Sequence, residues 1–342
     1  MSRILVTGSS GFIGRHVVKR ALGRGHEVVA FVRDGRAFRA RVPVSEAGVG
    51  AETGTGTGDG VCVVEGDVRD REAVERAVQG CHAVIHLAAL YSFDSSQAGR
   101  MREINVAGTE NVLRAAVAAG VERIVYTGTV GGTAFSRERL ATEADLAGAE
   151  MMKGPYKRSK FEAEGVVRRL AMEGAPVVTV CPTAPIGPGD AKPTPTGGIV
   201  RDFLRRRMPA YVDTGLNFVH VGDVAEGHLL ALERGDIGKR YLLGNIDGNL
   251  TLAQALEILS ELTGTPAPRL RLPHGAVLAA ARASEAAGRA LRRPAAISVE
   301  AAQMASTRMW VDPSWSVGRL QMPQTPVRQA FKEAVEWFAE HA

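Results

Sequence analysis

The chain has 342 residues, which suits one large α/β domain or two domains of ordinary size. Apolar residues make up 45% and charged residues 23% of it, a globular usage that excludes wholesale disorder and collagen-like fibres. The formal charge is only +5, from 42 Lys and Arg against 37 Asp and Glu. Anionic small ligands are slightly favoured, and no nucleic-acid partner is expected because a dense basic stripe is missing from the sequence.

The three cysteines, Cys62, Cys81 and Cys181, stand far apart and show neither a disulfide framework nor a zinc spacing. No metal site is predicted from them. The first apolar run is too short for a signal-peptide core, and no uncharged apolar run approaches the ~20 residues that span a bilayer. We therefore expect a soluble, cytoplasmic protein with no integral membrane segment.

Strand-like and helix-like segments alternate along the first half of the chain. Short β-branched runs predict strands at Arg3–Thr7, Glu27–Val32, Val61–Glu65, Ala83–Leu87, Arg123–Thr127 and Pro176–Cys181. Helical spacing lies between them at Phe12–Leu22, Arg71–Val78, Glu103–Ala119 and Arg158–Met172. Near-continuous apolar strands separated by helices predict the α/β class, with a doubly wound parallel sheet covered on both faces.

A glycine-rich turn follows the first predicted strand and opens the first helix. Its sequence is Gly8-Ser9-Ser10-Gly11-Phe12-Ile13-Gly14. Gly8 would allow the tight turn, Gly11 the approach of a pyrophosphate, and Gly14 close packing of helix on strand. The phosphate would meet the free N–H groups and the positive end of that helix. The context predicts a dinucleotide site of the Rossmann type.

The second predicted strand ends in Val32-Arg33-Asp34, where the cofactor ribose is expected. Val32 occupies the place of an NAD-selective acid, and Arg33 can hold a 2′-phosphate, which favours NADP. Asp34 keeps NAD open, because its carboxylate could bind the 2′-hydroxyl. Asp67, after the third strand, could accept a hydrogen bond from adenine or could cap the following helix.

Tyr156 and Lys160 stand four residues apart near the start of a predicted helix, so they share one face. A free phenol has a pKa of ~10, and a neighbouring ammonium would lower the pKa of Tyr156 toward the range useful for proton transfer. Thr129 follows the fifth strand, at the edge where a parallel sheet presents catalytic groups. Its hydroxyl could hydrogen-bond a substrate carbonyl.

These constellations, together with His86-Leu87-Ala88-Ala89, Asn105–Thr109 and Val219–Ala225, resemble the extended short-chain dehydrogenase/reductase family, also called the NAD-dependent epimerase/dehydratase family. The resemblance covers nearly the whole chain. Within the family it is closest to the hopanoid-associated sugar epimerase group, through Ala149–Lys160, Pro185–Gly197 and Met208–Asn217. Dihydroflavonol-4-reductase-like enzymes come next. One departure is Gly128-Thr129, where the group usually has two serines.

The resemblance implies that Thr129, Tyr156 and Lys160 are catalytic. It also implies that Asn105 completes a proton relay through water, although an interior structural role for Asn105 stays open. The cofactor site that it implies consists of Gly8, Ser10, Gly11, Phe12, Ile13, Gly14, Arg33, Asp67, Val68, Leu87, Ala88, Ala89, Thr127, Tyr156, Lys160, Pro182 and Thr183.

Two stretches interrupt the alternation and set the expected domain boundaries. The Gly/Thr/Ala-rich run from Ser45 to Gly60 predicts a surface insertion, and prolines cluster from Pro182 onward. We assign residues 1–180 and 214–245 to a Rossmann NAD(P)-binding domain. Residues 181–213 and 246–342 are assigned to a smaller C-terminal substrate lobe.

The sequence predicts an NAD(P)-dependent oxidoreductase that transfers hydride to a ketone or aldehyde with Tyr156 as acid and base, preferring NADP over NAD. An NAD-dependent epimerase of sugars or nucleotide sugars is the alternative, and a non-catalytic NADP-sensing regulator is an alternative of another class. A dehydratase is not expected, because Val130-Gly131 supply no acidic pair. The expected partners are a small carbonyl or sugar substrate and a second copy of the chain, paired through the helices at 103–119 and 158–172.

Overall fold

The computed structural model describes residues 2–40, 42, 60–136, 138–291, 293 and 297–341. Its centre is a seven-stranded sheet in the order β10-β6-β5-β4-β1-β2-β3, and every neighbouring pair is parallel. The strands are β1 (Arg3–Thr7), β2 (Glu27–Val32), β3 (Val61–Glu65), β4 (Ala83–His86), β5 (Arg123–Thr127), β6 (Val177–Pro182) and β10 (Arg240–Leu243). The predicted fold class is confirmed.

The direction in which strands are added reverses between β1 and β4, so their carboxyl ends open a crevice where ligands bind in such sheets. Thr7, the last residue of β1, lies opposite Phe31 of β2 and His86 of β4. The central strands carry Val, Ile, Leu and Ala, which are buried because helices cover both faces.

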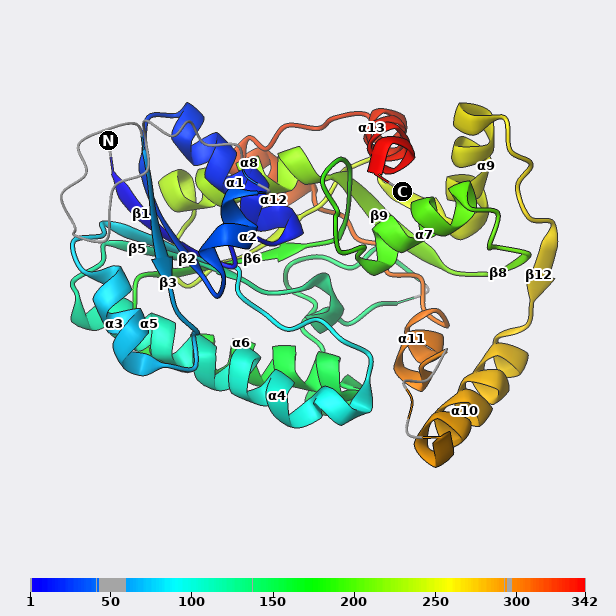
Figure 1. Cartoon of the computed structure of the whole chain (residues 1–342), viewed down its shortest axis with the longest axis horizontal. Coiled ribbons are helices and arrows are strands. Elements are labelled where there is room, and N and C mark those ends of the chain that lie inside the picture. The colour runs from blue at the N-terminus through cyan, green and yellow to red at the C-terminus, as the bar shows by residue number, and fades with distance from the viewer. Residues whose placement is uncertain are drawn as a thin grey trace.

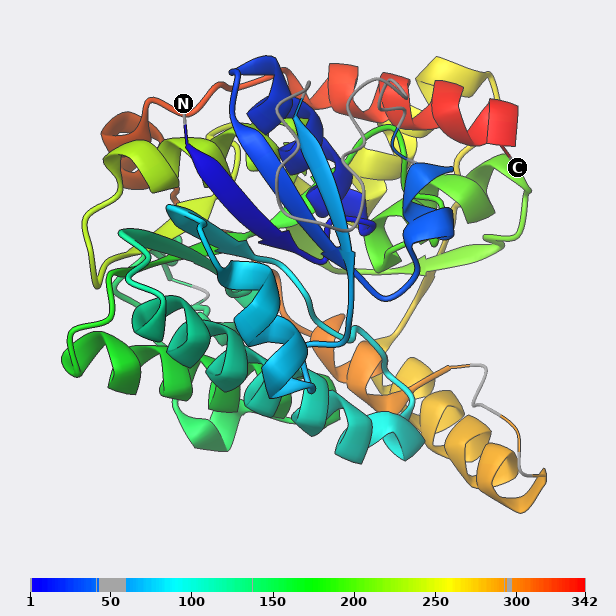
Figure 2. The same cartoon turned by 60° about the vertical axis from the view of Figure 1, so that its left-hand side comes forward.

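Two helical layers enclose this sheet (Figures 1 and 2). One layer contains α1 (Phe12–Gly23), α8 (Val221–Arg234) and α12 (Ser314–Leu320), with α2 (Gly35–Arg39) at its margin. The other contains α3 (Arg71–Val78), α4 (Ala98–Arg102), α5 (Gly108–Ala118) and α6 (Pro155–Met172). A separate apolar cluster fills the space under each layer.

The predicted helix over 103–119 is interrupted. A π-helical turn at Glu103–Ala107 separates α4 from α5. In this turn Asn105 is buried and its backbone carbonyl accepts a hydrogen bond from the Thr109 hydroxyl at 2.6 Å. Helical periodicity of apolar residues cannot reveal such an extra residue, because the flanking turns keep their pattern.

A second lobe is built on two small sheets. One is β11-β9-β7, from β7 (Ala184–Ile186), β9 (Gly215–His220) and β11 (Asn249–Thr251). The other pairs β8 (Ala210–Val212) with β12 (Leu270–Leu272). Phe218 and Phe331 centre its apolar cluster under α7 (Pro195–Leu204), α9 (Leu252–Thr263) and α13 (Val327–His341). β9, which the sequence assigns to the first domain, therefore pairs within the smaller sheet.

Two further helices, α10 (His274–Leu291) and α11 (Val299–Met304), extend from this lobe and are called the arm below. Figures 1 and 2 show the arm reaching down past the sheet toward the layer of α4 and α6. No helix in the described ranges is long and apolar enough to cross a membrane. The predicted insertion at Ser45–Gly60 falls, up to residue 59, outside the described residues.

Candidate active site

The glycine-rich turn has the geometry of an anion cradle. Gly8 adopts a φ of +70°, and a Cβ there would lie 2.7 Å from the Ala88 nitrogen. A Cβ at Gly14 would lie 2.2 Å from the Gly8 carbonyl oxygen, so helix α1 packs on the turn only because no side chain intervenes. Gly11 is the N-cap of α1, and no side chain among the described residues caps this end. The first-turn N–H groups are thus available to a phosphate.

Arg33 and Asp34 divide their roles at the end of β2. Asp34 is the N-cap of α2 and accepts a hydrogen bond from the Ala37 nitrogen at 2.9 Å. Arg33 is exposed. The Glu65 carboxylate, at the end of β3, accepts a hydrogen bond from the Gly35 nitrogen at 2.8 Å. The carboxylates of Asp34 and Glu65 therefore each accept a hydrogen bond from a backbone N–H group, whereas Arg33 is exposed.

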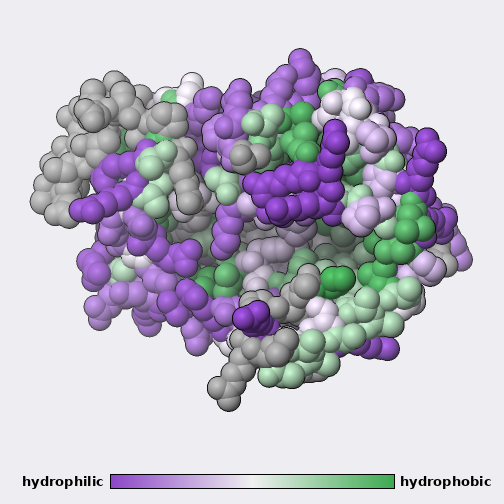
Figure 3. Space-filling model, turned by 45° about the vertical axis from the view of Figure 1, so that its right-hand side comes forward, coloured by the Kyte–Doolittle hydropathy of each residue, from purple (hydrophilic) through white to green (hydrophobic). Residues whose placement is uncertain are grey.

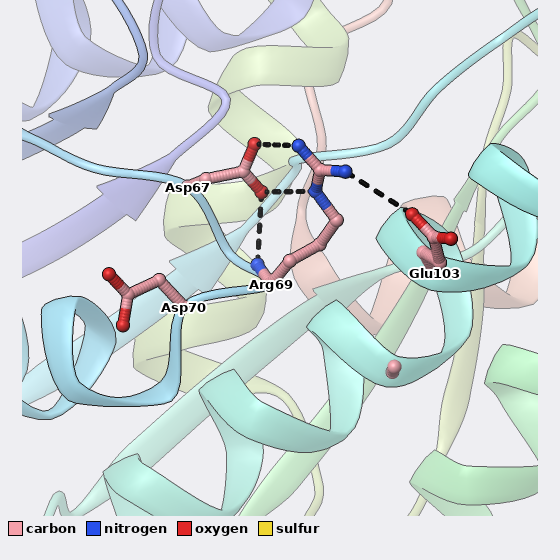
Figure 4. Close-up of a pocket in the computed structure, with 5 residues that line it drawn as sticks. Asp67, Arg69, Asp70 and Glu103 are labelled. Carbon is pink, nitrogen blue, oxygen red and sulfur yellow. Dashed lines mark hydrogen bonds and ion pairs between the residues drawn. The ribbon is translucent and has the colours of Figure 1, made fainter.

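Asp67 does not cap the next helix. Asp70 does so, accepting a hydrogen bond from the Ala73 nitrogen at 3.1 Å. The Asp67 carboxylate instead binds Arg69, whose Nε and Nη2 donate at 3.0 and 2.9 Å. Arg69 lies between Asp67 and Glu103 at the edge of a hollow of about 510 Å³ (Figure 4). The hydrogen bond with Arg69 lowers the pKa of Asp67, which keeps this carboxylate an acceptor.

A buried polar chain connects the glycine-rich turn with the π-helical turn. The Thr7 hydroxyl lies 2.7 Å from His86 Nδ1, and His86 Nε2 lies 3.0 Å from the Thr109 hydroxyl. Thr109 in turn donates to the Asn105 carbonyl. Burial lowers the pKa of His86 to about 3, so the imidazole is neutral. The motif His86–Ala89 thus links β1, β4 and α5.

Asn105 uses both donors of its amide within the protein. Its Nδ2 donates to the Leu90 carbonyl at 3.0 Å and to the Ser159 hydroxyl at 2.9 Å, and its Oδ1 accepts from the Leu90 nitrogen at 2.7 Å. Ser159 lies on α6 between Tyr156 and Lys160. Asn105 therefore fastens the segment after β4 to the helix that carries the predicted catalytic pair.

Thr129 and Tyr156 meet at the carboxyl end of β5. Tyr156 is 9% exposed, and its phenol lies near the Thr129 side chain. The rings of Tyr91 and Phe93 lie 4.2 and 6.3 Å from the Tyr156 ring. Burial raises the pKa of Tyr156 above its usual value, the nearby Thr129 side chain lowers it, and the charge of Glu300 raises it.

Lys160 is buried on the same helix, and its Nζ donates to the Thr127 carbonyl at 2.8 Å. Burial lowers the pKa of Lys160 to about 8. Lys160 is not among the groups that shift the pKa of Tyr156, and burial of the phenol is the largest cause of its raised pKa. The ammonium lies 4.9 Å from the centre of the Tyr126 ring.

A buried ion pair supports the segment after β5. Arg240 of β10 lies 3.5 Å from Glu164 of α6. Its Nη2 donates to the Thr133 hydroxyl at 2.9 Å and to the Thr129 carbonyl at 3.4 Å. Because Arg240 contacts both ends of this segment, it holds the Thr129 backbone in place.

Other predicted cofactor residues lie along the same edge of the sheet. The Thr127 hydroxyl lies 3.0 Å from His228 Nε2, and Thr183 is tied to the Leu243 carbonyl through its nitrogen at 3.2 Å. The rest lie in the glycine-rich turn (Ser10), in the first turn of α1 (Phe12, Ile13), after β3 (Val68), after β4 (Leu87, Ala89) and at the end of β6 (Pro182).

Sequence reasoning did not find Glu300, Arg240, Glu164 or Ser159. Glu300 contacts a helix 144 residues earlier in the chain, and Arg240 reaches Thr129 from 111 residues away. Isolated charged residues on a short helix and on an edge strand carry no local signal of such contacts.

Comparisons with known proteins agree with this geometry. The family model described as NAD dependent epimerase/dehydratase matches residues 4–244. A Synechocystis protein named "Putative dihydroflavonol 4-reductase" is 38% identical over 98% of this chain and 94% of its own. Sterol demethylase protein B of Methylococcus capsulatus is 31% identical over 98% of both chains. The crystal structure of a nucleoside-diphosphate-sugar epimerase from Pseudomonas aeruginosa superposes with a TM-score of 0.76 at 25% identity, covering 99% of this chain and 98% of that one.

Proposed function

The chain belongs to the NAD-dependent epimerase/dehydratase family, and we propose that within it the protein is an NADP(H)-dependent carbonyl reductase with Tyr156 as its acid and base. The coarser statement follows from the comparisons: the protein is an NAD(P)-dependent oxidoreductase or epimerase of the extended short-chain type. The direction of the reaction, the cofactor preference and the residue roles are our proposal.

The closeness of the Tyr156 phenol to the Thr129 side chain, at the carboxyl end of β5, carries this proposal. Two hydroxyls at one buried point can hold the same carbonyl oxygen, one on each lone pair. Tyr156 then donates its proton to that oxygen, and Thr129 keeps the substrate oriented. The pKa of Tyr156, which burial raises, keeps the phenol protonated at neutral pH, as a proton donor must be. In the reverse direction the phenolate accepts the alcohol proton.

The residues present fit a dinucleotide. The uncapped N-terminus of α1 would hold its pyrophosphate, and Lys160 would lie toward the nicotinamide ribose. When bound, the nicotinamide supplies the hydride for the carbonyl carbon. Arg33 supports NADP over NAD, because its guanidinium is exposed while the Asp34 carboxylate is used in capping α2.

The cofactor preference that we infer from Arg33 also favours reduction over epimerisation. A reductase exchanges its cofactor in every cycle, whereas an epimerase regenerates its own cofactor and retains it. The name of the Synechocystis relative, which specifies a reductase, supports this direction. The Tyr91 and Phe93 rings beside Tyr156 also suit a carbonyl compound with an apolar body. The intact pair of Tyr156 and Lys160 argues against a non-catalytic regulator.

Two further expectations belong to this proposal. We propose a homodimer in which the helices at 103–119 and 158–172 form a four-helix seam, supported by their position on the outer face of the same layer (Figure 1). A monomeric mass at micromolar concentration would contradict it. The cytoplasmic location is likewise a prediction from cysteine usage, and a cell-fractionation experiment tests it.

The change Tyr156→Phe tests the chemical role directly. We expect it to leave NADPH affinity unchanged and to lower turnover by at least ~10²-fold, the effect of losing a general acid. Steady-state kinetics with NADPH and a panel of ketones and aldehydes measures this. Tyr241→Phe is the matched control, because its hydroxyl donates to Asp236, in the segment before β10, and not to a group of the site. Equal turnover in the wild type and in Tyr156→Phe would refute the assignment.

A further inference from the structure

The arm reaches the catalytic helix through one side chain. Glu300, on α11, is 4% exposed, and its two carboxylate oxygens accept hydrogen bonds from the backbone nitrogens of Tyr156 and Lys157 at 3.3 and 3.0 Å. Figures 1 and 2 show α11 beside the end of α6. The face that carries the arm is hollowed between the arm and the rest of the molecule, and the alanine-rich α10 lies at its lower rim (Figure 3).

The N-terminus of α6 is built to receive this carboxylate. An α-helix begins with N–H groups that have no partner within the helix. Pro155 has no N–H, and the Arg158 nitrogen already donates to the Gly154 carbonyl at 3.2 Å. The N–H groups of Tyr156 and Lys157 remain, and Glu300 accepts from both. A carboxylate is also favoured there by the positive end of the helix dipole.

Gly154 shows that the contact is closely fitted. Its φ is +92°, and a Cβ at this position would lie 2.2 Å from the Glu300 carboxyl carbon. Any larger residue would have to displace Glu300. Glu285, on α10, accepts a hydrogen bond from the Val299 nitrogen at 2.8 Å and so fixes the start of α11. The second lobe thus holds the catalytic helix through a chain of backbone-bound carboxylates.

We propose that Glu300 is a positioning residue that couples docking of the arm to the proton transfer by Tyr156. By binding the nitrogen of Tyr156 itself, Glu300 fixes the first turn of α6 and the direction of the phenol toward Thr129. This inference rests on the proposed function of Tyr156. It adds that the substrate lobe completes the catalytic half of the site through this contact.

The charge of Glu300 acts on the same phenol. It opposes formation of the phenolate and raises the pKa of Tyr156 beyond the effect of burial. Two other groups facing Glu300 are Lys157, which lowers the pKa of Glu300, and Glu285, which raises it. The net effect of burial and these charges is a raised pKa of Glu300.

The groups around the phenol are Thr129, which lowers the pKa of Tyr156, and Tyr91, whose own pKa is raised by burial and by Tyr156 and Glu300. Lys160 lies one helical turn further along α6. Of the charged side chains in this set, only Glu300 comes from the arm. Neutralising it lowers the pKa of Tyr156 and therefore moves the alkaline decline of the reduction rate to lower pH.

Three variants separate the hydrogen bonds from the charge. Glu300→Ala removes both, whereas Glu300→Gln keeps an acceptor oxygen and removes the charge. Glu261→Ala is the matched control, because it removes a carboxylate of the second lobe, on α9, that pairs with Arg328 of α13 and takes no part in this chain of contacts. Each full-length variant is measured for backbone amide hydrogen exchange at Tyr156 and Lys157, for NADPH affinity, and for the pH profile of reduction with the carbonyl panel.

We expect the exchange of these two amides to rise by roughly 5- to 30-fold in Glu300→Ala, the range for a lost N-cap, and by less in Glu300→Gln. Glu261→Ala should match the wild type, and NADPH affinity should be unchanged in all three. The alkaline limb of Glu300→Gln should move down by roughly 0.5–1 pH unit.

Wild-type exchange in Glu300→Ala would overturn the proposal, and so would an unshifted pH profile in an active Glu300→Gln. Hydrogen exchange needs no substrate, so it decides the role of Glu300 even if no carbonyl is turned over. A wild type without any turnover would instead count against the proposed function.

Discussion

The N-termini of helices α1 and α6 differ in whether a side chain of the protein binds their free N–H groups. Helix α1 begins at Gly11 with no acidic residue in its first turn and no side-chain cap among the described residues. Helix α6 begins at Gly154, also without a cap from its own segment, but Glu300 of the arm binds its free N–H groups. The helix dipole has the same direction at both N-termini, and each has N–H groups without a partner within the helix.

The difference shows how one physical device serves two purposes. An open N-terminus attracts an external anion, and at α1 this fits the phosphates of a dinucleotide. A closed N-terminus uses a carboxylate of the protein, and at α6 this fixes a helix whose second residue is Tyr156. The protein thus leaves the N-terminus of α1 open for its ligand, and it uses the N-terminus of α6 to orient its proposed acid.

The largest effect is expected from placing a carboxylate at the N-terminus of α1, which would make it resemble the N-terminus of α6. We expect Gly11→Asp to lower NADPH affinity by at least about a hundredfold, because a carboxylate ~4 Å from a phosphate costs about 4 kcal/mol at an effective dielectric of 20. The free energy of unfolding should stay close to that of the wild type, since Asp is a good N-cap. Fluorescence titration with NADPH and chemical denaturation measure the two quantities.

Gly11→Asn is the matched control for this change, because it has the same shape and no charge. Both variants place a Cβ 3.1 Å from the Gly8 carbonyl oxygen, so this crowding cancels in the comparison. Equal affinities for NADPH in the two variants would show that charge at α1 does not govern binding.

Arg33 is expected to bind the other end of the same cofactor. We expect Arg33→Ala to remove most of a ten- to a hundredfold preference for NADPH over NADH, since a charge-assisted contact contributes about 1.5–3 kcal/mol. Dissociation constants of both cofactors for the wild type and the variant provide the measurement. Tightly bound NAD in the purified protein, with NADPH binding no better, would reverse the assignment.

Much of the cofactor side could be predicted from sequence because its signals are local. The bounds of β1, β2 and α3 agree with the predicted ones to the residue, and the glycine-rich turn spans seven positions. Periodicity and turn residues act within one element, so they are visible in order along the chain.

The catalytic side depends on distant contacts that leave no such pattern. Glu300 meets Tyr156 across 144 positions, and Arg240 meets Thr129 across 111. The sequence offers Asp67 as a cap of the helix at 71–78, but Asp67 binds Arg69 and Asp70 caps this helix instead. The π-helical turn around Asn105 likewise needs the polar chain from Thr7, which comes from another strand.

The smallest expected effect concerns His86, which connects the strand before the glycine-rich turn with the π-helical turn around Asn105. Its pKa in the folded protein is about 3, against 6.5 in the unfolded chain, so it stays neutral at neutral pH. The unfolded chain binds its proton first as pH falls below 6.5, so the stability of the folded state declines from there toward pH 3. From pH 7.5 to 5 this histidine should account for a loss of about 2 kcal/mol.

Denaturant unfolding of the wild type and of His86→Asn at both pH values isolates this contribution. The variant should lose about 2 kcal/mol less than the wild type between the two pH values, whatever its absolute stability. Parallel losses in the two proteins would mean that folding does not lower the pKa of His86.

Net reduction of a carbonyl where Tyr156 and Thr129 meet can be followed with deuterium. C4-deuterated NADPH is incubated with the protein and a panel of ketones, aldehydes and nucleotide sugars. We expect one NADPH to be oxidised for each carbonyl reduced, the label to lie on the former carbonyl carbon, and Tyr156→Phe nearly to abolish both. Interconversion of sugar epimers without net oxidation of cofactor and without label in the product would contradict it.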